Sequence, residues 1–478
     1  MVVTSRTQEL YTAGTEAIDL VLGGGIQQGA VMIFAGLPGT GKTVLAQQAV
    51  FANATPDHRA LYLATYSEPL AKVVRYLQKF SFYDEEKMHS SVVYRDLGQQ
   101  LRGGGIGSFA EVLEGYLEHE DYSLVVIDSL KALHDLNAPI QAFRLAVFDA
   151  AARFAALGVT SIWLGEYAPD AMDEYPEFAV ADGIVELRNT PHRLRTERSL
   201  RVLKMRGAAP LPGEHTFTIG RAGLEVFPRL IAADDIKRRP PRSERMSSEV
   251  DGLDQIMGGG FWRGTSTLVL GPAGAGKTTL GLSFLAAGAR LGEPGLLLTL
   301  EESPQELMAT MAAFGPDHAD ALDRVTIMHE SPIEADLVQV VLRLKEEIER
   351  GKVKRLVVDA IGGLRDAAID PSRLRAIIHS FIHFCAANGI TVLLNGELTL
   401  SGEQRLEDVG IPTMVDNILL LRHATTSSPP TLTVVKARRS AHALDARPIR
   451  VDAGGFHVGP HAGLPAETLA SQQADALL

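Results

Sequence analysis

The stretch GLPGTGKT, residues 36–43, has the spacing G-x-x-x-x-G-K-[ST] of a phosphate-binding loop. It follows the apolar run AVMIFAG (30–36) and opens the helical run VLAQQAVFAN (44–53), which is the context that this motif requires. Glycines let successive backbone N–H groups turn inward around a polyphosphate, and the helix N-terminus adds its positive dipole. The stretch therefore predicts a strand, a loop and a helix that together bind a nucleoside triphosphate.

A second loop of the same kind, GPAGAGKT (271–278), indicates an internal repeat. The segments 12–43 and 247–278 match along their whole length, and the match continues downstream, where SLVVIDSL (123–130) pairs with RLVVDAIG (355–362). A period this long indicates a duplicated domain and not a solenoid. A chance glycine-rich turn does not explain two loops in the same context.

The composition between the two copies changes to that of a connector. The run KRRPPRSER (237–245) has paired prolines and mixed charge without a hydrophobic period, which favours an exposed linker over a nucleic-acid contact. We expect a first domain at 1–230, a linker at 231–246, a second domain at 247–462 and a C-terminal tail at 463–478.

The pattern within each copy predicts an α/β fold. ALYLAT (60–65), SLVVID (123–128) and TSIWLG (160–165) are short and apolar, as buried parallel strands are. A helical stretch, 143–158, ends at Gly158, a common helix stop. Strands that alternate with helices imply a mainly parallel central sheet flanked by helices.

The totals limit the class of protein. The chain has 478 residues, of which 46% are apolar and 22% charged, with a net charge of −12 and one cysteine, Cys385. No apolar run is long enough to cross a bilayer, and the first ten residues do not resemble a signal peptide, so we expect a cytoplasmic protein without a membrane partner. The acidic charge makes nucleic acid an unexpected partner.

Each loop supplies its own set of nucleotide-binding candidates. Lys42 and Lys277 are expected to neutralise the outer phosphates, and Thr43 and Thr278 to offer a hydroxyl to Mg²⁺. The candidates of the first loop are Gly36, Gly39, Thr40, Gly41, Lys42, Thr43 and Val44. Those of the second loop are Gly271, Gly274, Ala275, Gly276, Lys277, Thr278 and Thr279.

An aspartate closes an aliphatic strand in each copy. Asp128 and Asp359 would lie at the carboxyl edge of the sheet beside the phosphate loop, where ligands collect. An ordinary aspartate at a strand end is the alternative, but the same placement in both copies favours a metal role. The predicted metal ligands are thus Thr43 with Asp128 and Thr278 with Asp359.

The two copies differ where hydrolysis needs a carboxylate to orient and activate water. Glu301 and Glu302 follow the strand GLLLTL (295–300), and two solvated acids are the alternative interpretation. When Pro69 is aligned with Pro304, the first copy has Tyr66 and Ser67 opposite the glutamates, and Glu68 is displaced. We therefore expect hydrolysis mainly in the second domain.

Two further glutamates, Glu166 and Glu397, end strands in the two copies and are second candidates for polarising water. The motifs KMR and KAR place Lys204 with Arg206, and Lys436 with Arg438, near the end of each copy. In a ring these cations could reach the γ-phosphate of a neighbouring subunit. A cationic solvent face is the alternative.

Together these motifs resemble the KaiC family of two-domain ATPases from the bacterial circadian clock. The resemblance spans nearly the whole chain and includes PEFAVADGIVELRN (176–189), but it is most particular at VLKMRGAAPLPGEHTFTIGRAGLEVFP (202–228). It implies two tandem RecA-like P-loop NTPase domains and a two-tiered homohexamer with ATP and Mg²⁺ between subunits. It further implies Lys and Arg pairs that act across the interface, and a KaiB-like or other signalling partner. The catalytic residues implied are Glu301, Glu302, Lys277, Lys436 and Arg438.

The chain departs from the clock protein itself. The clock protein carries adjacent Ser and Thr phosphorylation sites, whereas here Pro412 occupies the Ser position and only Thr413 remains. A two-site phosphorylation cycle is therefore not available, and weak autokinase activity at Thr413 stays open. We expect a KaiC-like homologue and not the clock oscillator.

Two other functions stay open on the sequence alone. One is a signalling scaffold whose nucleotide state controls partner binding. The other is a RecA/DnaB-like DNA-dependent ATPase in recombination or replication, because these proteins share the fold. His379 and His383, four apart on a predicted helix, are interpreted as helix packing, since Cys385 points to another face and does not complete a metal site.

Overall fold

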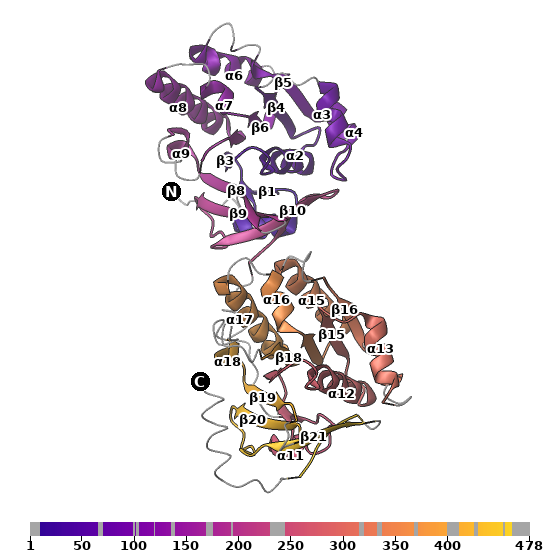
Figure 1. Cartoon of the computed structure of the whole chain (residues 1–478). Coiled ribbons are helices and arrows are strands. Elements are labelled where there is room, and N and C mark those ends of the chain that lie inside the picture. The colour runs from indigo at the N-terminus through magenta and orange to yellow at the C-terminus, as the bar shows by residue number, and fades with distance from the viewer. Residues whose placement is uncertain are drawn as a thin grey trace, which may run out of the picture. The chain divides into compact units, whose positions relative to one another are not determined.

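The computed structural model describes residues 10–65, 70–98, 101, 105–118, 120–134, 139–168, 175–192, 195–229, 244–314, 320–331, 337–367, 371–398, 411–424, 429–452 and 455–460. The chain divides into two compact units, Met1–Arg229 and Leu230–Leu478, which are described one at a time (Figure 1). The tail and the expected linker up to residue 243 lie outside the described residues.

The described part of the first unit contains a nine-stranded sheet in the order β11-β10-β9-β8-β3-β7-β6-β4-β5. Strands β8, β3, β7, β6, β4 and β5 are parallel, and β9, β10 and β11 extend the sheet with antiparallel pairs. The strands are β3 (Val31–Ala35), β4 (Arg59–Ala64), β5 (Val92–Asp96), β6 (Tyr122–Asp128), β7 (Thr160–Gly165), β8 (Gly183–His192), β9 (Arg195–Met205), β10 (Glu214–Gly220) and β11 (Gly223–Phe227).

The second unit repeats this topology strand for strand over its described residues. Its order, written from the opposite end of the sheet, is β16-β15-β17-β18-β14-β19-β20-β21-β22. The parallel part again ends where three antiparallel strands begin. The strands are β14 (Ser266–Gly271), β15 (Gly295–Thr299), β16 (Thr326–His329), β17 (Arg355–Asp359), β18 (Thr391–Glu397), β19 (Asn417–Arg422), β20 (Thr431–Ala437), β21 (Arg447–Asp452) and β22 (Gly455–Val458). The predicted α/β repeat with a mainly parallel sheet is confirmed.

Helices flank both sheets (Figure 1). In the first unit they are α1 (Glu16–Leu22), α2 (Lys42–Asn53), α3 (Leu70–Leu77), α4 (Glu85–Ser90), η1 (Ile106–Ser108), α6 (Phe109–Leu117), α7 (Lys131–His134), α8 (Ile140–Leu157) and α9 (Glu177–Val180). In the second unit they are α11 (Leu253–Ile256), α12 (Lys277–Arg290), α13 (Pro304–Ala312), α15 (Leu337–Gly351), α16 (Ile361–Ala367), α17 (Pro371–Ala387) and α18 (Ile411–Met414). Within the described ranges, none is long and apolar enough to span a membrane.

Two short strand pairs complete the described elements. They are β1 (Leu10–Tyr11) with β2 (Ile26–Gln27), and β12 (Arg245–Met246) with β13 (Phe261–Trp262). Because β12 pairs with β13, the last two residues of the expected linker belong to the second unit.

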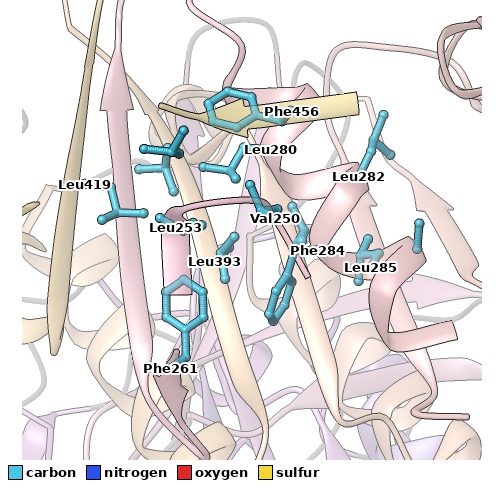
Figure 2. Packing of buried hydrophobic residues seen from close by; sticks show 14 of the residues in the cluster. Val250, Leu253, Phe261, Leu280, Leu282, Phe284, Leu285, Leu393, Leu419 and Phe456 are labelled. Carbon is cyan, nitrogen blue, oxygen red and sulfur yellow. The ribbon is translucent and has the colours of Figure 1, made fainter. Parts of the chain in front are cut away.

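Strand β3 shows why the apolar runs are unbroken. Met32 and Phe34 pack in one core cluster, and Val31, Ile33 and Ala35 pack in another on the opposite face of the sheet. A strand that is covered on both faces needs apolar residues at every position. Figure 2 shows the corresponding packing in the second unit. Phe284 of α12 lies among side chains from the sheet and from the segment that precedes β14.

A buried ion pair lies beneath α12. The guanidinium of Arg355, which is 1% exposed, donates 2.7 Å and 2.9 Å hydrogen bonds to Glu293 Oε2 and to the carbonyl oxygen of Phe284. Arg263 donates a 2.5 Å hydrogen bond to the other carboxylate oxygen of Glu293. A Cβ atom on Gly288 would lie 2.4 Å from Cδ of Arg355, so a glycine in α12 makes room for this arginine.

Candidate functional site

The first phosphate loop joins β3 to α2 through glycines with positive φ. Gly36, Gly39 and Gly41 have φ values of 150°, 77° and 103°, and Gly41 caps the N-terminus of α2. A Cβ atom on Gly36 would lie 2.2 Å from the carbonyl oxygen of Leu187. Only glycine fits these positions without strain, so the motif glycines set the path of the loop.

The loop lysine and its neighbours hold the loop together. Lys42 Nζ donates 2.9 Å hydrogen bonds to the carbonyl oxygens of Gly36 and Leu37, and the residue is only 7% exposed. Thr40 Oγ1 donates a 2.8 Å hydrogen bond to the carbonyl oxygen of Leu37, and Val44 packs against the core. The ammonium group therefore lies at the loop, where a phosphate would need it.

The second loop has the same geometry. Gly274 and Gly276 have φ values of 74° and 94°, and Lys277 Nζ donates hydrogen bonds of 2.9 Å to the carbonyl oxygen of Gly271 and 2.8 Å to that of Pro272. Ala275 is buried, and Thr278 and Thr279 lie in the first turn of α12. Burial lowers the pKa of Lys277, while the charges of Glu397, Asp359 and Glu301 act in the opposite direction. The loop lysine is therefore within reach of the charges of three carboxylates.

Asp128 and Asp359 end equivalent strands beside the loops. Asp128 pairs with Ala64 of β4, and Asp359 pairs with Thr299 of β15. Asp128 Oδ2 accepts a 3.0 Å hydrogen bond from Thr43 Oγ1, so the two predicted metal ligands of the first copy lie together. Burial raises the pKa of Asp128, opposed by the hydrogen bonds that it accepts and by the charge of Lys42.

These oxygen donors fit a magnesium ion. A threonine hydroxyl and a carboxylate at 3.0 Å from each other are the hard ligands that Mg²⁺ takes alongside phosphate oxygens. Among the described residues, no group of three or more His, Cys, Asp or Glu could enclose a metal on its own. A magnesium ion held by Thr43 and Asp128 would take its other oxygen ligands from water and from phosphate.

The turn after β15 holds the glutamate pair from both sides. Thr299 Oγ1 donates a 2.8 Å hydrogen bond to the carbonyl oxygen of Glu302. Directly after the pair, Ser303 caps α13 and forms a capping box with Glu306. Burial raises the pKa of Glu302, as do the charges of Asp359, Glu306 and Glu301. The pair thus lies at the same sheet edge as Asp359.

The corresponding turn of the first copy, with Tyr66, Ser67, Glu68 and Pro69, lies outside the described residues. The strand register up to Thr65 nevertheless supports the sequence alignment. Because Ala64 and Thr299 pair with equivalent aspartates, the second residue after each is Tyr66 in one copy and Glu301 in the other.

Glu166 and Glu397, the second candidates for polarising water, lie at or directly after the ends of strands near the loops. Glu166 directly follows β7, and its charge acts to raise the pKa of Asp128. Glu397 is the last residue of β18, where it pairs with Gly271 at the start of the second loop. Both candidates therefore lie near a phosphate loop.

The arginine of the KMR motif lies at the opposite edge of its sheet from the loop. Arg206 N–H donates to the carbonyl oxygen of Asp182, and Asp182 N–H donates to that of Val31, each at 2.8 Å. Val31 begins β3, whereas the loop follows its end, about 16 Å away at about 3.3 Å per residue. Lys204 lies two residues nearer the loop, paired with Ile184.

The KAR motif repeats this placement. Arg438 N–H donates to the carbonyl oxygen of Asp416, and Asp416 N–H donates to that of Ser266, the first residue of β14, each at 3.0 Å. Lys436 pairs with Ile418. Arg206 and Arg438 directly follow their strands, because β9 ends at Met205 and β20 ends at Ala437.

A pocket of about 530 Å³ that the sequence analysis missed lies beside α18. Thr413 lines it together with a predominantly basic set of side chains from α17 and the end of β20. The lining residues are Arg375, Ala376, His379, Ile382, His383, Thr413, Met414 and Arg438. Nε2 of His379 and Nε2 of His383 are 3.2 Å apart, so the two rings pack together but also face this pocket.

The sequence analysis also missed Tyr62, whose hydroxyl donates a 2.6 Å hydrogen bond to Asp128 Oδ2. A comparison of the two copies could have found it, since Leu297 occupies the equivalent position of β15. The apolar run around Tyr62 instead suggested only a buried strand.

The comparisons with known proteins agree with this architecture. The family described as "ATPase: KaiC" matches residues 11–231 and 246–463, one match for each unit. The chain belongs to the KaiC ATPase family. It is thus a tandem ATPase of the KaiC type, as the sequence resemblance indicated.

Among curated KaiC relatives is the circadian clock oscillator protein KaiC of Picosynechococcus sp. (PCC 7002). It is 29% identical over 457 residues, which is 92% of this chain and 87% of the relative. The KaiC of Thermostichus vulcanus is 29% identical over 85% of this chain and 80% of its own length. That of Rippkaea orientalis is 28% identical over 92% of this chain and 87% of its own length.

Proposed function

We propose that this KaiC-family chain is a regulatory ATPase that binds Mg-ATP in both phosphate loops and hydrolyses it mainly in the second domain. The nucleotides lie between the subunits of a two-tiered homohexamer. The nucleotide state of the ring controls the binding of a KaiB-like or other signalling protein. The first domain acts mainly as a nucleotide-held platform for assembly.

One observation carries the unequal roles of the two domains. Both loops have the same glycine geometry and a lysine bonded to the loop carbonyls. Only the second copy follows its equivalent strand with two glutamates, held by Thr299 and by the cap of α13. Water activation by a carboxylate contributes about 10²–10⁴-fold to a reaction rate. The second pocket therefore has the group that the first lacks at this position.

The placement of the KMR and KAR cations supports binding between subunits. Arg206 and Arg438 lie beside the start of the strand whose far end carries the phosphate loop of the same domain, and the two lysines lie two residues nearer the loop. An arginine side chain cannot cover that length of strand to reach its own nucleotide. Lys436 and Arg438 are instead suited to the γ-phosphate of a neighbouring subunit, as are Lys204 and Arg206 in the first tier.

Turnover of loop variants tests the proposal. Lys277→Ala is expected to abolish most hydrolysis, because it removes the charge that neutralises the phosphates of the second pocket. Lys42→Ala is expected to leave hydrolysis per assembled ring largely intact while weakening assembly, measured as mass with and without ATP. Full hydrolysis in Lys277→Ala with loss in Lys42→Ala contradicts the proposal. Stimulation by single-stranded DNA would instead favour the RecA/DnaB-like alternative.

A second activity, weak autophosphorylation of Thr413, is favoured by the basic pocket beside α18. Thr413 is exposed in this pocket, together with Arg375 and Arg438, which could compensate the charge of a phosphate group. Incubation with Mg-ATP followed by mass spectrometry of the peptide tests this. Phosphate is expected on Thr413 in the intact chain and not in Thr413→Val. An intact chain that stays unmodified after long incubation removes this activity.

A further inference from the structure

The hydroxyl of Tyr62 forms one of the shortest side-chain contacts at the first pocket. It donates a 2.6 Å hydrogen bond to Asp128 Oδ2, the same oxygen that accepts from Thr43 Oγ1 at 3.0 Å. Tyr62 is 3% exposed, and its ring stacks on that of Tyr94 with centroids 4.8 Å apart and planes at 25°. The phenol is therefore held rigidly against the carboxylate.

The phenol is the donor of this bond, because an ionised carboxylate can only accept. A neutral phenol beside an ionised carboxylate forms a charge-assisted hydrogen bond, which is short and strong. The orientation of the Asp128 carboxylate is thus fixed by two donors from different elements.

Over the part of the second unit that the structure describes, no equivalent of this contact is found. Tyr62 pairs with Val126 and Tyr94 in the first sheet, and Leu297 pairs with Val357 and Ile327 in the second. By this register, leucine and isoleucine replace the stacked tyrosines. The Asp359 carboxylate therefore lacks the phenol donor that Asp128 has.

Groups that bond to a metal ligand from outside the coordination sphere fix its orientation, and their loss costs about 10–100-fold in metal affinity. Tyr62 is in that position relative to Asp128. We propose that Tyr62 is a positioning residue of the first pocket, which acts through Asp128 to make nucleotide binding there more strongly Mg²⁺-dependent. This inference rests on the proposed function, in which Asp128 and Thr43 hold the ion.

The matched control is Tyr94→Phe. The Tyr94 hydroxyl is buried and has no hydrogen-bond partner among the described residues, whereas the Tyr62 hydroxyl contacts Asp128. Tyr62→Phe and Tyr94→Phe each remove one oxygen atom from the same ring stack. They therefore differ in the bond to the carboxylate and not in the size of the side-chain change.

The experiment measures binding of a fluorescent ADP analogue to the full chain, with and without Mg²⁺, in a Lys277→Ala background that isolates the first pocket. Tyr62→Phe is expected to weaken binding about 10–100-fold with Mg²⁺ and to leave it unchanged in EDTA. Tyr94→Phe is expected to match the background in both conditions. In an added Asp128→Ala background, Tyr62→Phe is expected to have no further effect.

Three outcomes would overturn the inference. One is full Mg²⁺-dependent affinity in Tyr62→Phe. Another is an equal loss in Tyr94→Phe, because ring packing would then explain both. The third is an undiminished effect of Tyr62→Phe when Asp128 is already alanine. If the background itself shows no Mg²⁺-dependent binding, the proposed function of the first pocket fails, which the measurement distinguishes from a failure of Tyr62 alone.

Discussion

Lys436 Nζ lies 2.8 Å from the carbonyl oxygen of Val415, and it donates a second hydrogen bond, also of 2.8 Å, to the carbonyl oxygen of Pro412. One lysine from β20 therefore ties together both ends of the turn that carries Thr413. Arg438 donates to the carbonyl oxygen of Thr413 itself, at 2.9 Å. The cations proposed to reach a neighbouring nucleotide thus also bond to the turn that carries the phosphorylation candidate, Thr413.

Mixed rings test whether Lys436 acts on a neighbour. Lys436→Met and the double variant Glu301→Gln/Glu302→Gln should each be nearly inactive as pure rings. In an equal mixture, about a quarter of the interfaces combine intact glutamates from one subunit with an intact lysine from the next. Hydrolysis should therefore recover to about a quarter of the normal rate, measured as phosphate release after subunit exchange.

Recovery in the mixture also shows that both variants fold, which separates the catalytic role of Lys436 from its bonds to the α18 turn. A mixture as inactive as its components, although mass measurement shows mixed rings, would contradict action across the interface.

Glu301→Gln and Glu302→Gln should lower kcat by about 10²–10⁴-fold, with little change in nucleotide affinity, because an amide cannot accept a proton from the attacking water. Steady-state phosphate release and nucleotide titration measure the two quantities. Glu306→Gln is the matched control from the same turn, since Glu306 is the third residue of α13 and completes its capping box. Glutamine can fill this position but loses the negative charge at the helix N-terminus, so stability should fall by about 0.3–1 kcal/mol and kcat should stay unchanged. A similar kcat loss in all three would point to the turn and not to the acids.

Two glycine substitutions in the second domain should have opposite signs. Gly288→Ala places a Cβ 2.4 Å from Arg355 Cδ, so we expect a loss of about 1–3 kcal/mol from overpacking. Gly362→Ala in α16 meets no atom within 4 Å and should stabilise by about 0.5–1 kcal/mol, because alanine favours helix. Urea unfolding measures both, and equal effects would contradict the packing beneath α12.

Glu293→Gln should reduce stability by about 3 kcal/mol at neutral pH, because it leaves the buried Arg355 without its carboxylate. Glu347→Gln, which breaks only the exposed pair with Arg350, should cost about 0–1 kcal/mol. Urea unfolding of both variants at neutral pH gives the comparison.

The contribution of Glu293 should also depend on pH. Burial alone would raise the pKa of Glu293, but hydrogen bonds from Arg263 and Arg355 bring it below its ordinary value. Its stabilisation is thus fully present above the unfolded pKa of about 4.3 and is lost as pH falls through the lower folded pKa. Wild type should approach Glu293→Gln in acid. A constant gap down to that pH would contradict the assignment.

The sequence predicted the elements that a strong local pattern determines. The glycines of the two loops and the apolar runs located β3, β4, β6, β7 and β14, and Gly158 ends α8 as expected, with φ 69°. Glycine spacing and burial on both faces of a strand produce patterns within a few consecutive residues. These patterns can therefore be recognised in one copy of the repeat.

Features that depend on register between distant strands could not be read in this way. Arg206 is placed by hydrogen bonds that pass through Asp182 to β3, and the pocket beside Thr413 needs α17 and β20 to meet. The hydrogen bond from Tyr62 to Asp128 likewise depends on the register between β4 and β6. Comparison of the two copies still indicated the glutamate asymmetry, because that difference is visible in the chain itself.

The phosphate loop and the arginine of the cationic motif lie at opposite ends of the strands of one sheet, and this has a consequence for assembly. In the proposed arrangement each subunit supplies cations at one end and a bound nucleotide at the other, so contacts run head to tail. Any open row leaves one nucleotide without cations and one cation pair without a nucleotide. Only a closed circle satisfies every copy, and loss of a single member would expose both kinds of end at once.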